Sequence, residues 1–167
     1  MKDKLVIKID QDSNQASKFS VTDDISEVYG LPEIYEYIND QKPLRAMIDI
    51  DALQENMKAN GIKTQEVFIR IYLSFIRALY QIFDCSWKDI FKGLVIVTSS
   101  DPSKCNYHIL YVPTLLINYH ELKVFTELVY IITGEKFDKY INRGLPGQNF
   151  NLRLIGSAKK DHVKCIL

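Results

Sequence analysis

The 167-residue sequence lacks several features that would assign it to a particular class of protein. Its three cysteines are scattered, so none forms the closely spaced pair of a structural zinc site, and their odd number argues against a disulfide framework. No apolar run approaches the roughly 20 residues that cross a bilayer, and the first residues lack the apolar core of a signal peptide. We therefore expect a soluble intracellular protein that does not use a membrane.

The sequence also lacks net charge, but its charges are unevenly distributed along the chain. Lys and Arg total 21 and Asp and Glu total 21, which argues against overall electrostatic attraction to nucleic acid. Residues 1–60 nevertheless carry a net charge of −5, and residues 136–167 carry +5. This gradient is typical of an anion-facing surface near the C-terminal end, and equally of an ordinary solvated face.

The chain has the composition of one soluble globular domain, which we expect to cover residues 1–167. It is 47% hydrophobic and 25% charged, and no repeat or low-complexity linker divides it. Apolar positions at helical spacing predict a helix over residues 64–83. A second helix is predicted near 118–133, ended by Gly134 as a suitable C-cap residue. A short helix is predicted over 24–39, restarting at Pro32. Strands are predicted within the first 20 residues and over 44–50, 93–99, 107–112 and 150–156.

This mixed order of elements predicts the fold class. Strand, helix, hairpin, helix and strand follow one another, which is typical of an α+β domain. We expect two layers, with helices packed on one face of a largely antiparallel sheet.

Two acids at the end of an apolar run, Asp49 and Asp51, give the first indication of chemistry. Side chains two residues apart lie on the same side of a strand, where two like charges repel each other unless a cation lies between them. A hard ion with oxygen ligands, Mg²⁺ or Mn²⁺, would relieve that repulsion, and this favours phosphoryl-group chemistry. The same pair also fits a solvated turn, or a cap for a helix that starts at Ala52.

Three further short motifs follow this acid pair: the segment 99–108, Phe137-Asp138, and the segment 153–159. In their order and spacing, over about residues 30–160, the four motifs resemble the archaeo-eukaryotic primase superfamily. The nearest similarity is to the primase-polymerase domains of large DNA viruses and mobile elements. The resemblance implies an RRM-like sheet with helices on one face and the motif residues on the other.

The resemblance also implies roles for the acids and for the cations they would hold. Asp49, Asp51 and Asp138 would together ligate two Mg²⁺ or Mn²⁺ ions, as three carboxylates do in two-metal sites. Asp138 considered by itself fits a capping or turn residue equally well.

Nucleotide-binding roles are implied for residues in the second and fourth motifs. His108 would contact the phosphates, although a single histidine on an apolar strand is also a common core residue. Asn106 stands where the family usually has a serine, so its side-chain amide would donate a hydrogen bond in place of a hydroxyl group. Considered by itself, the turn before Asn106 also fits a plain hairpin connection. The lysines of the fourth motif also fit an ordinary solvated surface, and Lys160 could make the same phosphate contact as Lys159. The remaining implied phosphate contacts are Ser100, Ser103, Lys104, Arg153, Ser157 and Lys159.

The function implied by the resemblance is that of a DNA primase or primase-polymerase. Such an enzyme is a nucleotidyltransferase that adds NTPs or dNTPs to a 3′-hydroxyl on a single-stranded DNA template, often beside a helicase or accessory primase domain. Two alternatives remain open from the sequence. One is a non-catalytic single-stranded nucleic-acid-binding module of the same fold, and the other is a metal-dependent nuclease.

Overall fold

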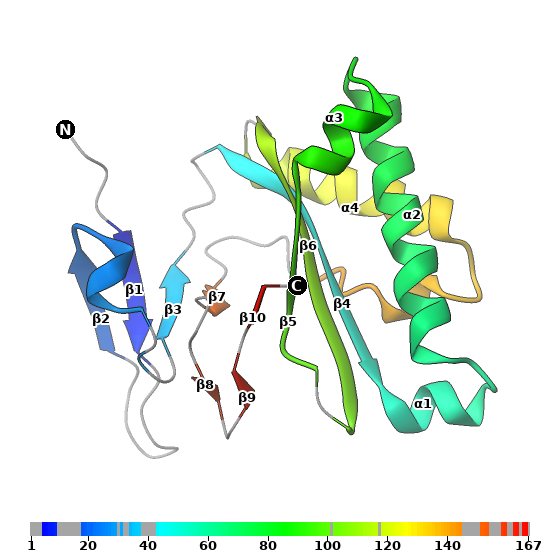
Figure 1. Cartoon of the computed structure of the whole chain (residues 1–167), viewed down its shortest axis with the longest axis horizontal. Coiled ribbons are helices and arrows are strands. Elements are labelled where there is room, and N and C mark those ends of the chain that lie inside the picture. Colours follow the sequence, from blue (N-terminus) through cyan, green and yellow to red (C-terminus); the bar gives the residue numbers. More distant parts are fainter. Residues whose placement is uncertain are drawn as a thin grey trace.

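A computed structural model gives the arrangement of the chain (Figure 1). It describes residues 5–9, 18–29, 31, 34–37, 43–100, 102–116, 118–144, 151–153, 158–159, 162–163 and 165–166. Within these residues the protein is α+β, with antiparallel sheets and four α-helices. The predicted fold class is confirmed at this level.

The larger sheet contains the acid pair. Its strands are β4 (Leu44–Leu53), β5 (Leu94–Thr98), β6 (Lys104–Leu116) and the short β10 (Cys165–Ile166), in the spatial order β10-β5-β6-β4. β6 pairs antiparallel with both β4 and β5, so it lies at the centre of the sheet. The predicted strands at 44–50, 93–99 and 107–112 are thus confirmed, and β4 and β6 extend beyond the predicted ends.

Two long helices cover one face of this sheet (Figure 1). They are α2 (Thr64–Ile82) and α4 (Tyr119–Thr133), and both were predicted from the sequence. Asn118 begins α4 because its side chain accepts from the backbone N–H groups of the first turn, and Gly134 ends it at φ 81°. The helices meet through Phe75 and Phe125, whose rings pack edge to face with their centroids 5.2 Å apart.

The core lies between the helices and the sheet. Alternate residues of β4 enter it: Ala46, Ile48, Ile50 and Ala52 are at most 1% exposed. The same alternation places the intervening residues of β4 on the opposite face. Core packing therefore determines which face carries the acids.

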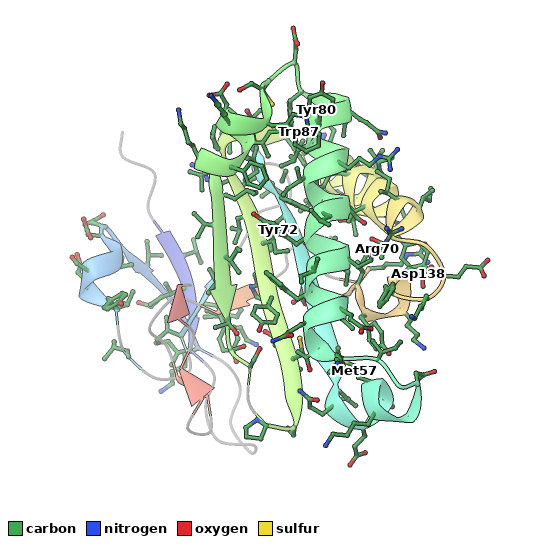
Figure 2. The ribbon with its side chains drawn as sticks, turned by 45° about the vertical axis from the view of Figure 1, so that its right-hand side comes forward. Met57, Arg70, Tyr72, Tyr80, Trp87 and Asp138 are labelled. Carbon is green, nitrogen blue, oxygen red and sulfur yellow. The ribbon has the colours of Figure 1, made fainter. Side chains whose placement is uncertain are left out.

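Two shorter helices complete this part of the chain. α1 (Gln54–Ala59) follows β4 directly, and α3 (Trp87–Lys92) packs against the end of α2 through a stack of Trp87 on Tyr80 at 4.5 Å (Figure 2). Because β4 continues to Leu53, Asp51 does not cap a helix, and that alternative is wrong.

A smaller antiparallel sheet is formed by β1 (Leu5–Ile9), β2 (Lys18–Thr22), β3 (Ile34–Tyr37) and β7 (Asn151–Arg153). Its own apolar cluster contains Ile7, Val28 and Ile34. The helix predicted over 24–39 is wrong: the described residues of this segment form a single 3₁₀ turn, η1 (Ile25–Glu27), and the strand β3. Pairing with β1 and burial of Ile34 stabilise the strand there.

The C-terminal part of the chain is described only in short pieces. The strand predicted over 150–156 is confirmed for β7, while residues 150 and 154–156 lie outside the described residues. A hairpin of β8 (Ala158–Lys159) and β9 (His162–Val163) follows.

Candidate functional site

The site is built on two neighbouring strands, β4 and β6. Their register places Asp49 opposite His108 and Asp51 opposite Asn106. Cys105 and Ile109 of β6 are fully buried in the core, so His108 shares with the acids the face that points away from α2 and α4. Asp49 and His108, 59 positions apart in the chain, therefore become direct cross-strand neighbours.

Asp49 is a buried carboxylate, only 6% exposed. Its Oδ1 lies 3.1 Å from Nε2 of His108, and its Oδ2 accepts a 2.8 Å hydrogen bond from Nδ2 of Asn142. No described donor is aligned to hydrogen-bond Oδ1, although the histidine is close. A buried carboxylate oxygen with unmet bonding capacity is unusual, and it is the kind of atom that a cation or a ligand donor satisfies.

Asp51 lies nearer to solvent and is paired differently. Its Oδ2 is 2.9 Å from Nζ of Lys104, and both side chains are about one-third exposed, at 38% and 34%. The negative charge of Asp51 also acts, after burial itself, to raise the pKa of the Cys105 thiol to about 11. Cys105 is therefore protonated at neutral pH and is not a nucleophile here.

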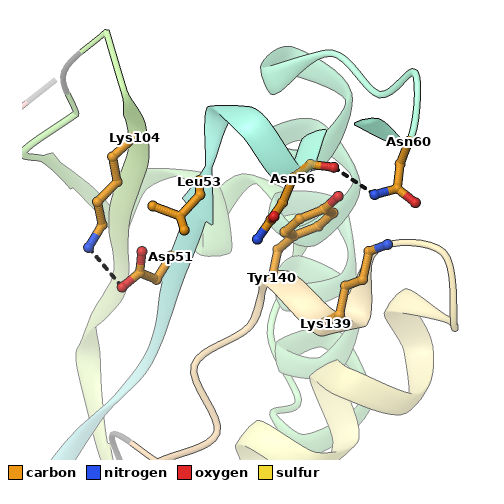
Figure 3. A pocket seen from close by; sticks show the side chains of 7 residues that line it. All are labelled: Asp51, Leu53, Asn56, Asn60, Lys104, Lys139 and Tyr140. Carbon is orange, nitrogen blue, oxygen red and sulfur yellow. Dashed lines mark hydrogen bonds and ion pairs between the residues drawn. The ribbon is translucent and has the colours of Figure 1, made fainter. Parts of the chain in front are cut away.

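A pocket of about 480 Å³ opens beside this ion pair (Figure 3). Its volume is within the roughly 300–1,000 Å³ of typical ligand sites. The walls come from β4, α1, β6 and the 3₁₀ turn η2 (Asp138–Tyr140). The hydroxyl of Tyr140 is buried with no described hydrogen-bond partner. The lining residues are Asp51, Leu53, Asn56, Asn60, Lys104, Lys139 and Tyr140.

The turn between β5 and β6 is held by its own polar side chains. Asn106 donates its backbone N–H to Oγ of Ser100, and the Ser100 hydroxyl lies 3.1 Å from the Asn106 carbonyl. Ser99 donates to Oδ1 of Asn106. The carbonyl of Ser103 accepts from the N–H of Gln54 at the start of α1, which ties this turn to β4. These contacts place Ser100, Ser103 and Asn106 beside the acid pair and give their polar groups a structural role.

Asp138 lies in η2, the turn that follows α4 (Figure 2). Its side chain is buried, but Asp138 does not line the pocket that its neighbours Lys139 and Tyr140 line. Within the described part of the chain, no three His, Cys, Asp or Glu side chains form a group that could hold a metal ion. The structure therefore brings Asp49, Asp51 and His108 onto one face and does not bring Asp138 into a metal-binding group with them.

The last predicted motif lies mostly beyond these contacts. Arg153 is in β7, opposite Tyr35, so its backbone belongs to the smaller sheet and not to the sheet that carries the acids. Lys159 is in the β8 hairpin. Ser157 and Lys160 lie outside the described residues.

Asn142 is the residue that the sequence did not single out. Its backbone N–H donates to the carbonyl of Asp49 at 2.9 Å, next to a β-bridge between Ile50 and Ile141. The only signal in the sequence is an apolar residue followed by a polar one, four positions after Phe137-Asp138.

Comparison with family models and with curated proteins found no match to this chain. Among the helices that the structure describes, none combines the length and the apolar character needed to span a membrane.

Proposed function

We propose that this chain is a nucleotidyltransferase of the primase or primase-polymerase type. It would add nucleotides from NTPs or dNTPs to a 3′-hydroxyl on a single-stranded DNA template. The observation that supports this most is the cross-strand pair of Asp49 and His108, with Asp51 and Lys104 next to it on the same sheet face. Acids beside an imidazole and an ammonium group provide both a cation-binding and a phosphate-binding surface.

The order of elements agrees with an RRM-like sheet. Apart from the short helices α1 and α3, the elements β4, α2, β5, β6 and α4 follow the order of the first five elements of a β-α-β-β-α-β unit. β6 lies between β4 and β5, and the segment after α4 bridges the other edge of β4 at Ile141. That edge is where the last strand of such a unit would pair, so we propose an RRM-like core.

The acid pair fits a hard divalent cation, Mg²⁺ or Mn²⁺. Among the described residues, no donor is aligned to hydrogen-bond the buried Oδ1 of Asp49, and Asp51 lies on the same face. Asp49 and Asp51 would hold one ion. The second ion implied by the resemblance would require a third carboxylate, the role proposed for Asp138. When bound, such an ion stabilises the charge that develops on phosphoryl oxygens during transfer.

The chain's own cationic and polar residues would hold the triphosphate. Lys104 can turn from Asp51 to a phosphate oxygen, and the imidazole of His108 faces the same side of the sheet. Ser100, Ser103 and Asn106 would keep the β5–β6 turn in place beneath it. We retain Arg153, Ser157 and Lys159 as proposed phosphate contacts, and a helicase or accessory primase domain as a proposed partner.

Incorporation of labelled nucleotide on primed and unprimed single-stranded DNA, with Mg²⁺ or Mn²⁺, tests this function. The double variant Asp49→Asn, Asp51→Asn is expected to lose incorporation, because it keeps the side-chain shapes and removes both negative charges. Glu55→Gln, at an exposed position in α1, removes one charge nearby and serves as the matched control. A double variant as active as the parent would refute the proposal, and shortened DNA would indicate a nuclease.

A non-catalytic single-stranded nucleic-acid-binding module is the second candidate. It is favoured by the pairing of Asp51 with Lys104 and of Asp49 with Asn142, because both acids then have partners without any cation. Fluorescence anisotropy with a labelled oligonucleotide separates the two functions. Salt-sensitive binding that is unchanged by a chelator, without nucleotide incorporation, would support the module.

A further inference from the structure

Asn142 makes a set of contacts that fixes its own orientation. Its Oδ1 accepts a 3.1 Å hydrogen bond from the backbone N–H of Gly144, so the opposite end of the amide, Nδ2, must face Asp49. The backbone of Asn142 is held as well, because its N–H donates to the Asp49 carbonyl beside the bridge from Ile50 to Ile141. The side-chain amide is thus presented to the acid from a fixed support.

This arrangement determines the orientation of the Asp49 carboxylate. Nδ2 of Asn142 donates a 2.8 Å hydrogen bond to Oδ2 of Asp49, and Oδ1 is then directed toward His108. Asp49 is more than nine-tenths buried, and Oδ1 has no aligned donor among the described residues. One oxygen of the acid is therefore anchored by Asn142, and the other faces His108 without an aligned donor among the described residues, on the face that carries Asp51.

We propose that Asn142 is the positioning residue of this site. It holds Asp49 so that Asp49 and Asp51 together form a two-carboxylate site for one divalent cation, to which Asp138 does not contribute. The proposal rests on the function proposed above, and it names the residue that orients one of the two carboxylates of its cation site. A neutral amide suits this position because it donates to Asp49 in the absence of the ion, whereas an acid there would repel it.

Mn²⁺ binding by the purified full-length chain, followed by electron paramagnetic resonance, tests the assignment. Asn142→Ala removes the anchor, and we expect the Mn²⁺ dissociation constant to rise about 10- to 100-fold, as for other residues that orient metal ligands. Asn142→Asp adds a third carboxylate. This variant should melt at a lower temperature than the parent in chelator, and should gain more thermal stability from Mn²⁺ than the parent gains. Glu55→Gln, at an exposed position in α1, is the matched control and should bind Mn²⁺ as the parent does.

Each contrary result overturns the proposal. Parent-like Mn²⁺ affinity in folded Asn142→Ala, or an Asn142→Asp variant with no larger Mn²⁺-induced stabilisation than the parent, would leave Asn142 a purely structural role. Loss of Mn²⁺ binding in Asp138→Asn would assign the third position to Asp138 instead. The Asn142→Asp measurement also remains decisive if Asn142→Ala does not fold.

The two proposals fail in different ways. If Mn²⁺ binding follows Asn142 but no nucleotide is incorporated, the cation site stands and the primase function falls. If nucleotides are incorporated and Mn²⁺ affinity is indifferent to Asn142, the enzyme stands and the positioning role falls.

Discussion

Replacing Lys104 by methionine should strengthen the binding of a divalent cation. Nζ of Lys104 lies 2.9 Å from Oδ2 of Asp51, so a cation that uses Asp51 must first displace the lysine. The pair is about one-third exposed, and ion pairs of this kind contribute roughly 0.2–1 kcal/mol. Since 1.4 kcal/mol corresponds to a factor of ten, Lys104→Met should lower the Mn²⁺ dissociation constant about 1.4- to 5-fold.

The control and the salt dependence make this prediction specific. Lys63→Met removes the same charge from an exposed position before α2 and should leave Mn²⁺ affinity unchanged. The gain from Lys104→Met should shrink as ionic strength rises, because the Debye length is only about 8 Å at 0.15 M salt. A Lys104→Met variant that binds Mn²⁺ as weakly as the parent at low salt would show that Lys104 and the cation do not compete for Asp51. Titrations monitored by electron paramagnetic resonance measure both effects.

Three further predictions concern stability. Phe75→Ala should lower the free energy of unfolding by about 3–5 kcal/mol in urea titrations, because Phe75 is fully buried against Phe125; a loss below 1 kcal/mol would contradict the packing of α2 on α4. Gly93→Ala should cost about 1–3 kcal/mol in the same assay, since the new Cβ would lie 2.5 Å from the Pro113 ring, and parent-like stability would contradict this close approach. Burial raises the pKa of Cys105 to about 11 from an ordinary 9.0, so the protonated thiol should stabilise the fold below pH 9, and this contribution should be lost as the pH rises toward 11. Cys105→Ala should flatten the dependence of the free energy of unfolding on pH over this range.

The elements that could be predicted from sequence are those with a long, one-sided apolar pattern. α2 places Val67, Ile71 and Phe75 in the core at spacings of four residues, which the sequence shows directly. The strand β3 could not be predicted in this way. Four residues carry too little periodicity, and the partner that stabilises them, β1, is specified only in the folded chain.

The candidate site, like the fold, could be predicted from the sequence only in part. The pairing of Asp49 with His108 depends on the register of two long strands, and the motif order indicated both residues without the structure. Asn142 reaches Asp49 across 93 residues, through a single bridge that no local pattern encodes. Residues that orient a functional side chain are generally harder to find than that side chain, because their role depends on contacts made only after folding.

The charges of the site indicate how a cation and a nucleotide would depend on each other. Without a cation, Asp51 is balanced by Lys104, and Asp49 is held by a neutral amide, so the face is stable with nothing bound. A cation at Asp51 displaces Lys104 and leaves its ammonium group without a counter-ion, whereas a triphosphate bound at the same time would supply one. Each ligand should then raise the affinity for the other by the same factor. Under the proposed function, divalent cations alone should therefore bind weakly, and Lys104→Met should abolish most of the coupling between cation and nucleotide.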